Sequence, residues 1–275
     1  MLRDRLLSCL RAMGDSPDYR RLAAEVLGIR GAPEALARRL VRQALVMEDR
    51  RESWGEAGER ICRAAPADPG VYVLRDEEGR ALYVGKAVNL RRRLRAHFAT
   101  RRWRATPPTL ARAVDAEWRV VGSDLEALLR EADLIAELQP PGNVQVGAPD
   151  LQRRAVPRAL VRDVLVVVPS VEEDSVEMVG ARVDGRWMIQ RTRRDGADLK
   201  VHATRVRRFF SPLLSVNRSD PAPLAPIVFS WLAGRGAGAT RLDPHDVTSA
   251  RDLRARLAAL LADERLFAER LVIYS

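Results

Sequence analysis

The sequence predicts an α+β protein of several domains, because the spacing of its apolar residues changes along the chain. Apolar residues recur with the helical period of about 3.6 up to residue 60, and then alternate with polar residues between 71 and 84, which is typical of strands. Beyond residue 150, strand-like and helix-like segments both occur. Proline-rich residues 64–69 separate the first two regions, so we expect domains at 1–64, 65–147 and 148–275.

The first domain should be helical. Two apolar stripes with helical spacing, at 2–10 and 36–47, lie on either side of a break at Gly31-Ala-Pro33. The order of these segments, followed by residues 48–54, resembles a winged helix in which Trp54 lies in the wing. A plain three-helix bundle has the same periodicity, so both alternatives stay open.

The central domain should begin with a β-hairpin. Residues 71–74 and 81–84 are strand-like runs on either side of the polar turn 76–79. Symmetric pairing without a bulge would put Tyr72 directly opposite Tyr83, with both phenols on one face of the sheet. The two tyrosines should therefore be neighbours.

Two helices and a third strand should complete this domain as a small three-stranded antiparallel sheet flanked by helices. A helix capped by Asn89 should carry Arg93 and His97 on one face. Residues 116–121 fit the third strand, and residues 123–126 form a capping box for a helix that ends before two consecutive prolines.

Glu131 falls at the margin of the apolar stripe of that last helix, not on its solvent side. An acidic side chain at such a margin is either paired or used in chemistry. Spacing alone favours the first alternative, a carboxylate paired with one of the many arginines.

The C-terminal domain should again be α+β. Val164 to Val168 form a buried strand, and Asp184-Gly185 is a strong turn signal between two further strands at 179–183 and 186–190. The remaining expected elements are helices at 198–210, 224–233 and 248–263 and a closing strand at 271–274.

The charge of the chain predicts a polyanionic partner. Forty-seven Lys and Arg against 37 Asp and Glu give a net charge of +10, and residues 86–114 contain nine basic residues and no acid. Basic residues interleaved with flat rings suit nucleic acid, whereas a solvated Arg-rich helix face is the alternative. The candidate DNA-binding residues are Arg91, Arg92, Arg95, Arg101, Arg102, Trp103 and Arg104.

Other features restrict the class of protein. Cys9 and Cys62 are the only cysteines, so a single chain cannot build a disulfide framework or a four-thiolate metal site. The sequence has neither an apolar run long enough to cross a membrane nor a signal peptide. We therefore expect a cytoplasmic protein without a membrane partner.

Several separated motifs agree with one known family. The elements are GVY at 70–72, YVG at 83–85 followed by Lys86, LREADLIAEL around Glu131, and an asparagine after the proline pair. Residues 67–146 thus resemble the GIY-YIG endonuclease superfamily, most closely the N-terminal nuclease domain of the excinuclease subunit UvrC and the shorter Cho endonuclease. The resemblance implies an active site of Tyr72, Tyr83, Lys86, Arg93 and Glu131, which Asn143 braces.

The chain also departs from these relatives. His97 stands where the family often has a tyrosine, so its expected role is an auxiliary contact to phosphate or a proton. About 125 residues follow the domain, too few for the second nuclease and the further modules of a complete UvrC subunit. The C-terminal cysteines of Cho-type proteins are absent, and no proofreading-type exonuclease is visible.

The residue types fit phosphodiester hydrolysis. Glu131 can give one hard oxygen ligand to a divalent metal ion, Mg or Mn, whose other ligands are water and phosphate. Arg93 suits the scissile phosphate, and one tyrosine can act as general base if a neighbouring cation lowers its pKa. We favour Tyr83 over Tyr72 as the base because it lies near Lys86 in sequence, and which tyrosine acts stays open.

Lys86 is itself informative, because only it and Lys200 are lysines among the 47 basic residues. A lysine at this position suggests that an ammonium is specifically needed. The structural alternative is that the tyrosines pack the hairpin while Lys86 and Arg93 are solvated.

The sequence therefore predicts a hydrolase, a metal-dependent DNA endonuclease that nicks one strand in repair. Its expected partners are damaged or branched DNA and a repair protein that loads it. The resemblance implies products with 5′-phosphate and 3′-hydroxyl ends. The alternative is a catalytically silent DNA-binding adaptor that retains the nuclease fold, and RNA as the substrate is not excluded by phosphate contacts.

Of three other groups of polar residues, two have ordinary interpretations and the third is a candidate for DNA binding. Asp243-Pro-His245-Asp246 is better explained as a turn and helix cap than as a metal cluster. Residues 172–174 fit a polar loop. A further basic group is a candidate extension of the DNA surface: His202, Arg205, Arg207 and Arg208.

Overall fold

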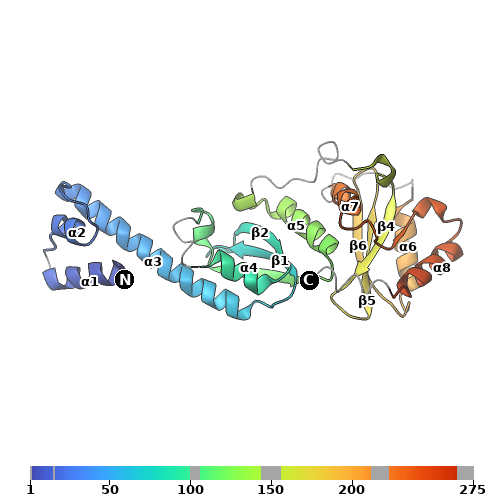
Figure 1. The fold of residues 1–275 in the computed structure, drawn as a ribbon, viewed down its shortest axis with the longest axis horizontal. Helices are drawn as coiled ribbons and strands as arrows, with labels where there is room; N and C mark the ends of the chain where they lie inside the picture. Colours follow the sequence, from blue (N-terminus) through green and yellow to red (C-terminus); the bar gives the residue numbers. More distant parts are fainter. Residues whose placement is uncertain (1, 15, 100–105, 144–155, 212–222, 265–275) are drawn as a thin grey trace.

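The computed structural model describes residues 2–14, 16–99, 106–143, 156–211 and 223–264, which Figure 1 shows as an extended chain of three groups of elements. The N-terminal group consists of α1 (Leu2–Met13), α2 (Tyr19–Glu25) and α3 (Glu34–Ala64). Within the described residues, no helix is long and apolar enough to cross a membrane.

The long helix α3 belongs to two hydrophobic cores. Its first half packs against α1 and α2 around Leu6, Leu22 and Val41. Its second half packs on the central domain, where the rings of Trp54 and Phe98 lie 5.1 Å apart. The expected wing is therefore wrong, because Trp54 is a residue of α3 and the described part of 1–64 contains no strand.

The central domain confirms the expected three-stranded antiparallel sheet. Its strands are β1 (Gly70–Arg75), β2 (Ala81–Ala87) and β3 (Asp115–Val120), in the order β2-β1-β3. Helix α4 (Leu90–His97) covers one face, and α5 (Asp124–Leu138) covers the other. Short 3-10 turns follow at η2 (Leu110–Arg112) and η3 (Pro141–Asn143). Strand β2 is an edge of the sheet.

The two tyrosines are diagonal neighbours, which corrects the expected register. Tyr72 pairs with Gly85, and Tyr83 pairs with Leu74, which is two positions away from the expected register. The turn accounts for one position, since Arg75 pairs with Ala81 and not with Arg80, and the irregularity between Leu74 and Arg75 accounts for the other. An extra residue in one strand shifts every later pair by one position. Both phenols nevertheless lie on the same face, as expected, with ring centres 6.1 Å apart.

The helix caps confirm local signals in the sequence. The Asn89 side chain accepts a hydrogen bond from the backbone N–H of Arg92 and so begins α4. Ser123 accepts from the N–H of Glu126 at 3.1 Å, and Glu126 reaches back to the N–H of Gly122 at 3.1 Å. This pair of bonds closely follows the predicted capping box.

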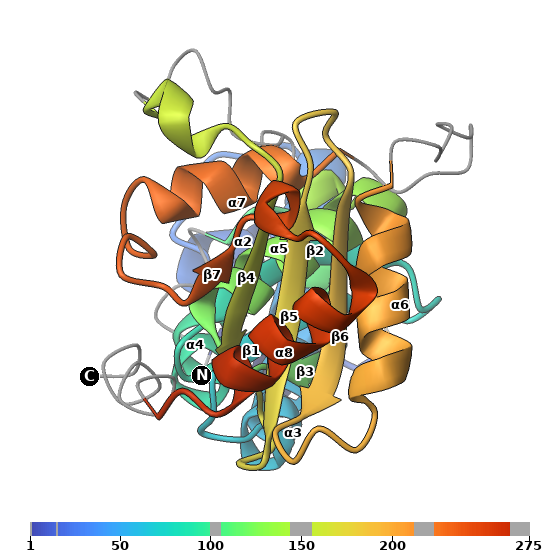
Figure 2. The same cartoon turned by 90° about the vertical axis from the view of Figure 1, so that its right-hand side faces the viewer.

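The C-terminal domain is a four-stranded antiparallel sheet between two layers of helices. Its strands are β4 (Val164–Pro169), β5 (Ser175–Ala181), β6 (Trp187–Arg193) and β7 (Arg241–Leu242), in the order β6-β5-β4-β7. Figure 2 shows α6 (Leu199–Phe209) and α8 (Ala250–Leu261) on the near side of the strands. The other face is covered by α7 (Ala225–Leu232) together with α5 of the central domain. The expected strand 271–274 lies outside the described residues.

Helix α5 joins the central and C-terminal domains. Leu125 and Leu129 are fully buried in the core that contains β4 and α7. At Gly122 the two backbones touch, since a Cβ on this glycine would lie 2.1 Å from the carbonyl carbon of Ser170. Because α3 and α5 each pack against two groups of elements, the domain boundaries at 64 and 147 stay predictions.

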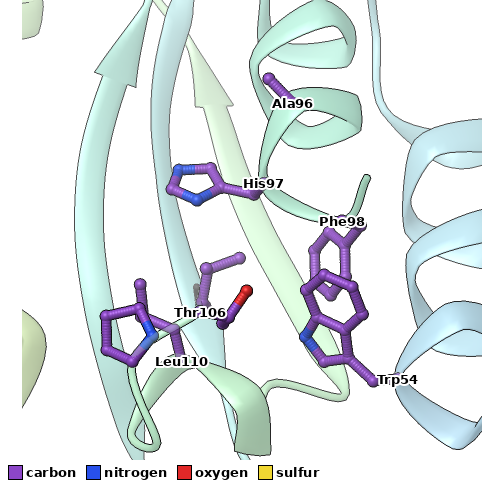
Figure 3. A pocket seen from close by; sticks show the side chains of 8 residues that line it. Trp54, Ala96, His97, Phe98, Thr106 and Leu110 are labelled. Atoms are coloured by element: carbon purple, nitrogen blue, oxygen red, sulfur yellow. The ribbon is translucent and has the colours of Figure 1, made fainter. Parts of the chain in front are cut away.

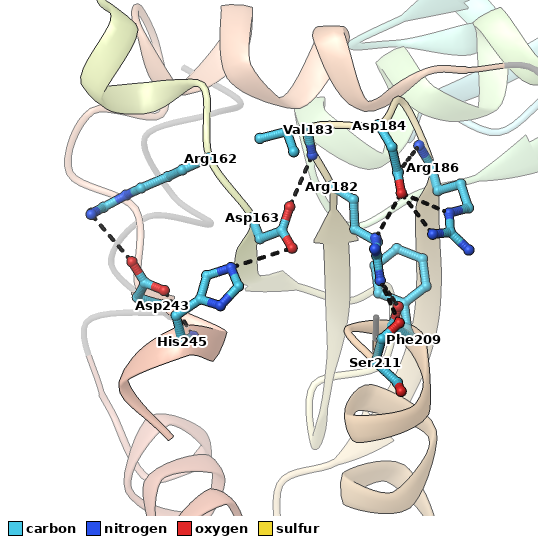
Figure 4. A network of polar contacts seen from close by, with 10 residues as sticks. All are labelled: Arg162, Asp163, Arg182, Val183, Asp184, Arg186, Phe209, Ser211, Asp243 and His245. Atoms are coloured by element: carbon cyan, nitrogen blue, oxygen red, sulfur yellow. Dashed lines mark hydrogen bonds and ion pairs between the residues drawn. The ribbon is translucent and has the colours of Figure 1, made fainter. Parts of the chain in front are cut away.

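The polar groups of the C-terminal domain have structural partners. Asp243 accepts a hydrogen bond from the N–H of His245 at 2.9 Å and pairs with Arg162 at 3.2 Å, while His245 lies 3.4 Å from Asp163 (Figure 4). Residues Pro244–Asp246 form a short 3-10 turn capped by Asp243, which confirms the predicted turn. Glu172 pairs with Arg191 at 2.6 Å.

The expected basic extension is only partly exposed. Arg205, Arg207 and Arg208 are exposed on α6. His202 is buried against the sheet with 8% exposure, so its place in a DNA-binding surface was a wrong expectation. Its position on the apolar stripe of α6, beside Val206, explains the burial.

Stability at the interface between the domains should depend on pH through Glu126. This side chain is fully buried, and burial, followed by the charge of Glu177, raises the pKa of its carboxyl. A carboxyl with a raised pKa in the folded state stabilises the fold while protonated, and this contribution is lost as the pH rises through that pKa. Glu126→Gln cannot ionise, so it should gain stability relative to the wild type as the pH rises from about 5 to about 8.

Thermal unfolding at both pH values measures this difference. Glu137→Gln, on the exposed side of the same helix, is the control. Its stability relative to the wild type should be the same at both pH values. A Glu126→Gln effect that does not change with pH would contradict the prediction.

Candidate active site

The free edge of β2 collects two of the candidate side chains. Its backbone N–H groups at Val84 and Lys86 point away from β1. The Lys86 N–H donates to Glu131 Oε1 at 3.0 Å. The Val84 N–H donates to Asn143 Oδ1 at 2.7 Å, and the Asn143 Nδ2 group donates back to the Val84 carbonyl at 2.8 Å. One amide side chain thus makes the pair of bonds that a neighbouring strand would make.

The aromatic candidates lie on the α4 face of the sheet, with Tyr72 on β1, Tyr83 on β2 and His97 on α4. Tyr72 is 1% exposed, and its Oη lies 2.6 Å from His97 Nε2. The Arg93 Nε donates to the same Oη at 3.4 Å. Tyr83 is half-buried, and its ring centre lies 5.6 Å from that of His97. The structure therefore brings both tyrosines, Arg93 and His97 into one cluster.

Gly85 makes this cluster possible. Tyr72 pairs with Gly85 across the ladder, and its ring lies over the glycine. A Cβ at Gly85 would lie 2.6 Å from Tyr72 Oη and 2.8 Å from Tyr83 Cε1. Any other residue would push the two phenols apart. Steric crowding thus explains why this position of the YVG motif is a glycine.

Burial raises the pKa of two of these groups, Tyr72 and Glu131. Burial raises the pKa of Tyr72, and the hydrogen bond from Arg93 only partly opposes that rise. Burial also raises the pKa of Glu131, while the charges of Lys86 and Arg93 and the Lys86 N–H bond oppose it. The Tyr72 phenol is therefore neutral at physiological pH.

Lys86 lies on the other side of the strand from the tyrosines. Side chains alternate along a strand, so Lys86 starts from the α5 face while Tyr83 and Gly85 belong to the α4 face. The Lys86 Nζ lies 3.5 Å from Asp124 Oδ1. Closeness in sequence, which favoured Tyr83 as the base, thus does not mean that Lys86 contacts its phenol.

The basic residues around α4 differ in what they can bind. Arg91 is half-buried, and its Nε donates to the Ala65 carbonyl at 2.7 Å, so it fixes the loop after α3. Arg92 and Arg95 are exposed. The other four candidates lie outside the described residues: Arg101, Arg102, Trp103 and Arg104.

The N-terminal helices also reach this region. A cavity of about 270 Å³ adjoins His97 and is walled by Trp54 and Phe98 on one side (Figure 3). Trp54 belongs to α3, outside the segment that carries the motifs. This contact could not be predicted from the sequence, because nothing in the periodicity indicates that α3 extends onto the central domain.

Asp124 is a second residue near the site that was not predicted from the sequence. It belongs to the predicted capping box, and it precedes Glu131 by seven positions, or about two helical turns. Residues at this spacing share one face of a helix. That spacing was the signal that could have identified it.

Comparison with known proteins identifies the central domain. A family model described as a UvrC-like GIY-YIG domain matches residues 68–144. UvrABC system protein C of Renibacterium salmoninarum is 49% identical over 82 residues, which are 29% of this chain and 12% of that protein. The protein of the same name from Caldicellulosiruptor saccharolyticus is 36% identical over 129 residues, 44% of this chain and 20% of that protein.

Solved structures give the same family name. The N-terminal GIY-YIG endonuclease domain of UvrC from Thermotoga maritima, bound to magnesium as its catalytic divalent cation, is 31% identical. The match covers 31% of this chain and 94% of that domain, with a TM-score of 0.26. The chain thus contains a UvrC-like GIY-YIG domain, as expected from its motifs, and its matches span an eighth to a fifth of the curated relatives' length.

Asn143 should matter for stability as well as for the site. It is 9% exposed, and Asn143→Ala would leave the Val84 N–H and carbonyl buried without these partners. We expect a loss of about 1–3 kcal/mol in the free energy of unfolding, measured by urea denaturation. Asn143→Asp keeps the acceptor and loses the donor, so it should fall between the wild type and Asn143→Ala. Equal stability of all three proteins would show that the edge contact is not stabilising.

Proposed function

We propose that this chain is a metal-dependent DNA endonuclease that nicks one strand of damaged or branched DNA during repair. The observation that carries the proposal is the arrangement around β2, with Glu131 bonded at the free edge and the tyrosines, Arg93 and His97 clustered on the adjoining face. The UvrC-like GIY-YIG domain supports the same chemistry.

The donor set fits a single Mg²⁺ or Mn²⁺ ion. Glu131 is a half-buried carboxylate, and no cluster of three potential ligands exists among the described residues. Magnesium commonly takes one or two carboxylates and keeps water and substrate phosphate as its other ligands. Glu131 would therefore hold the ion, as the magnesium in the related UvrC domain suggests. A bound ion would supply charge neutralisation at the phosphate and lower the pKa of a water molecule.

The protein's own groups divide the remaining work. Arg93 is exposed beside Tyr72, and its planar guanidinium can hold two oxygens of the scissile phosphate. Tyr83 is the better candidate for the general base, since it is half-buried while burial raises the pKa of Tyr72. Tyr72, hydrogen-bonded to His97, would then orient the attacking water or the phosphate as a neutral phenol.

The basic helix α4 supports DNA as the polyanion. Arg92 and Arg95 are exposed on the helix that also carries Arg93 and His97. They would hold the backbone of the strand that is cut. We further propose a cytoplasmic setting and a repair protein that delivers the enzyme, since the relatives are named as parts of a UvrABC system.

Glu131→Gln should separate binding from cutting. The amide keeps an acceptor for the Lys86 N–H but loses the charge that would hold the metal ion, so DNA binding should persist while nicking falls by at least about 100-fold. Conversion of supercoiled plasmid to its nicked form with Mn²⁺ measures cutting, and fluorescence anisotropy measures DNA binding.

Glu137→Gln on the same helix is the matched control and should cut normally. Equal cutting by Glu131→Gln would remove this residue from the mechanism. Salt-sensitive DNA binding by the wild type without nicking on any damaged, branched or supercoiled substrate would favour the silent adaptor instead.

The two tyrosines should differ when each loses its hydroxyl. Tyr83→Phe removes the proposed base and should lower the single-turnover rate by about 10²–10⁴-fold. Tyr72→Phe removes only a positioning bond, so its loss should be smaller, by about tenfold. Unchanged rates in both variants would exclude the phenols, and a much larger loss in Tyr72→Phe would exchange their roles.

A further inference from the structure

A chain of ion pairs runs from the candidate active site to the C-terminal domain. Lys86 Nζ lies 3.5 Å from Asp124 Oδ1, and Arg235 Nη1 lies 2.8 Å from Asp124 Oδ2. Asp124 is the first residue of α5, and Arg235 follows α7 in the C-terminal domain. One carboxylate thus binds a cation from each domain, with a different oxygen for each.

We propose that Asp124 is a positioning residue through which Arg235 of the C-terminal domain controls the place of the Lys86 ammonium. The kinetic part of this inference rests on the proposed function. Its structural part depends only on the contacts among the three residues.

The packing between the domains keeps Arg235 in reach of Asp124. Leu125 and Leu129, on the first turns of α5, are buried in the core with α7, the helix that leads to Arg235. The backbones also approach closely at Gly122, since a Cβ there would overlap the Ser170 backbone. The ion pair therefore sits at the rim of a tightly packed contact between the domains.

The Asp124 carboxylate is largely buried and interacts with two cations, Lys86 and Arg235. Its side chain is only 14% exposed, whereas those of Lys86 and Arg235 are 30% and 66% exposed. The two cations repel each other across the shared carboxylate, so the net attraction that holds each one there is weaker than it would be for a single cation. Loss of Arg235 should draw the Lys86 ammonium closer to Asp124, and loss of the Asp124 charge should release it.

Lys86 has room to respond. It lines a cavity of about 220 Å³ together with Val88 and Asp124. Its backbone N–H stays bonded to Glu131, so the ammonium can move while the strand keeps its position. A change at Arg235 can thus alter the charge near Glu131 without unfolding the site.

The scarcity of lysine allows a direct test. The chain contains only Lys86 and Lys200, so protein made with ¹³C-labelled lysine shows two sets of side-chain NMR signals. Lys86→Arg assigns them, and Lys200, far along the chain on α6, is an internal reference. Arg235→Ala and Asp124→Asn should each shift the Lys86 Cε signal and leave the Lys200 signal unchanged.

The same variants should change catalysis at saturating DNA. We expect Arg235→Ala to lower the single-turnover rate by about two- to fivefold, as for the loss of an exposed ion pair, and Asp124→Asn by about tenfold. The Kd for DNA should stay unchanged, and Arg235→Lys should restore the rate. Arg254→Ala, an exposed arginine of α8, is the control and should have no effect.

The two measurements separate the possible failures. A Lys86 signal that stays in place in both Arg235→Ala and Asp124→Asn would overturn the inference, whatever the nuclease does. A shifted signal with unchanged rates would overturn the positioning role. A shifted signal in the two variants, combined with a wild-type chain that cuts no DNA, would support the contact and overturn the proposed function.

Discussion

The unpaired edge of β2 is the constraint on which the candidate site depends. An edge strand has backbone N–H and carbonyl groups that need partners, and in many proteins a further strand supplies them. Here Asn143 and Glu131 do so at Val84 and Lys86, and both are side chains that the folding of α5 and η3 brings to the edge. A structural need of the sheet thus fixes the position of the carboxylate.

Helix α5 links this edge to the rest of the molecule. One of its faces carries Glu131 toward β2, and the other buries Leu125 and Leu129 in the core of the C-terminal domain. Helix α3 does the same on the N-terminal side, where Trp54 packs on Phe98 next to His97. The regions on both sides of the GIY-YIG domain therefore pack against it, and the basic charge remains concentrated at 86–114.

Local signals predicted most of the central domain. The cap at Asn89, the capping box at Ser123 and the alternation of the hairpin act over a few residues, so they can be read without the fold. The register of Tyr72 and Tyr83 was wrong by two positions, because the turn pairs Arg75 with Ala81 and the ladder is irregular at the next pair, and strand sequence encodes neither feature. The burial of His202, the length of α3 and the pairing of Asp124 with Arg235 depend on contacts between distant segments.

The number of Mn²⁺ ions bound per chain, counted by electron paramagnetic resonance, tests most directly whether the edge of β2 holds a metal site with one carboxylate. We expect one bound ion in the wild type and none in Glu131→Gln at the same concentration, while Glu126→Gln should keep the ion because Glu126 is buried near Glu177 of the other domain. Equal binding by the wild type and Glu131→Gln would contradict it.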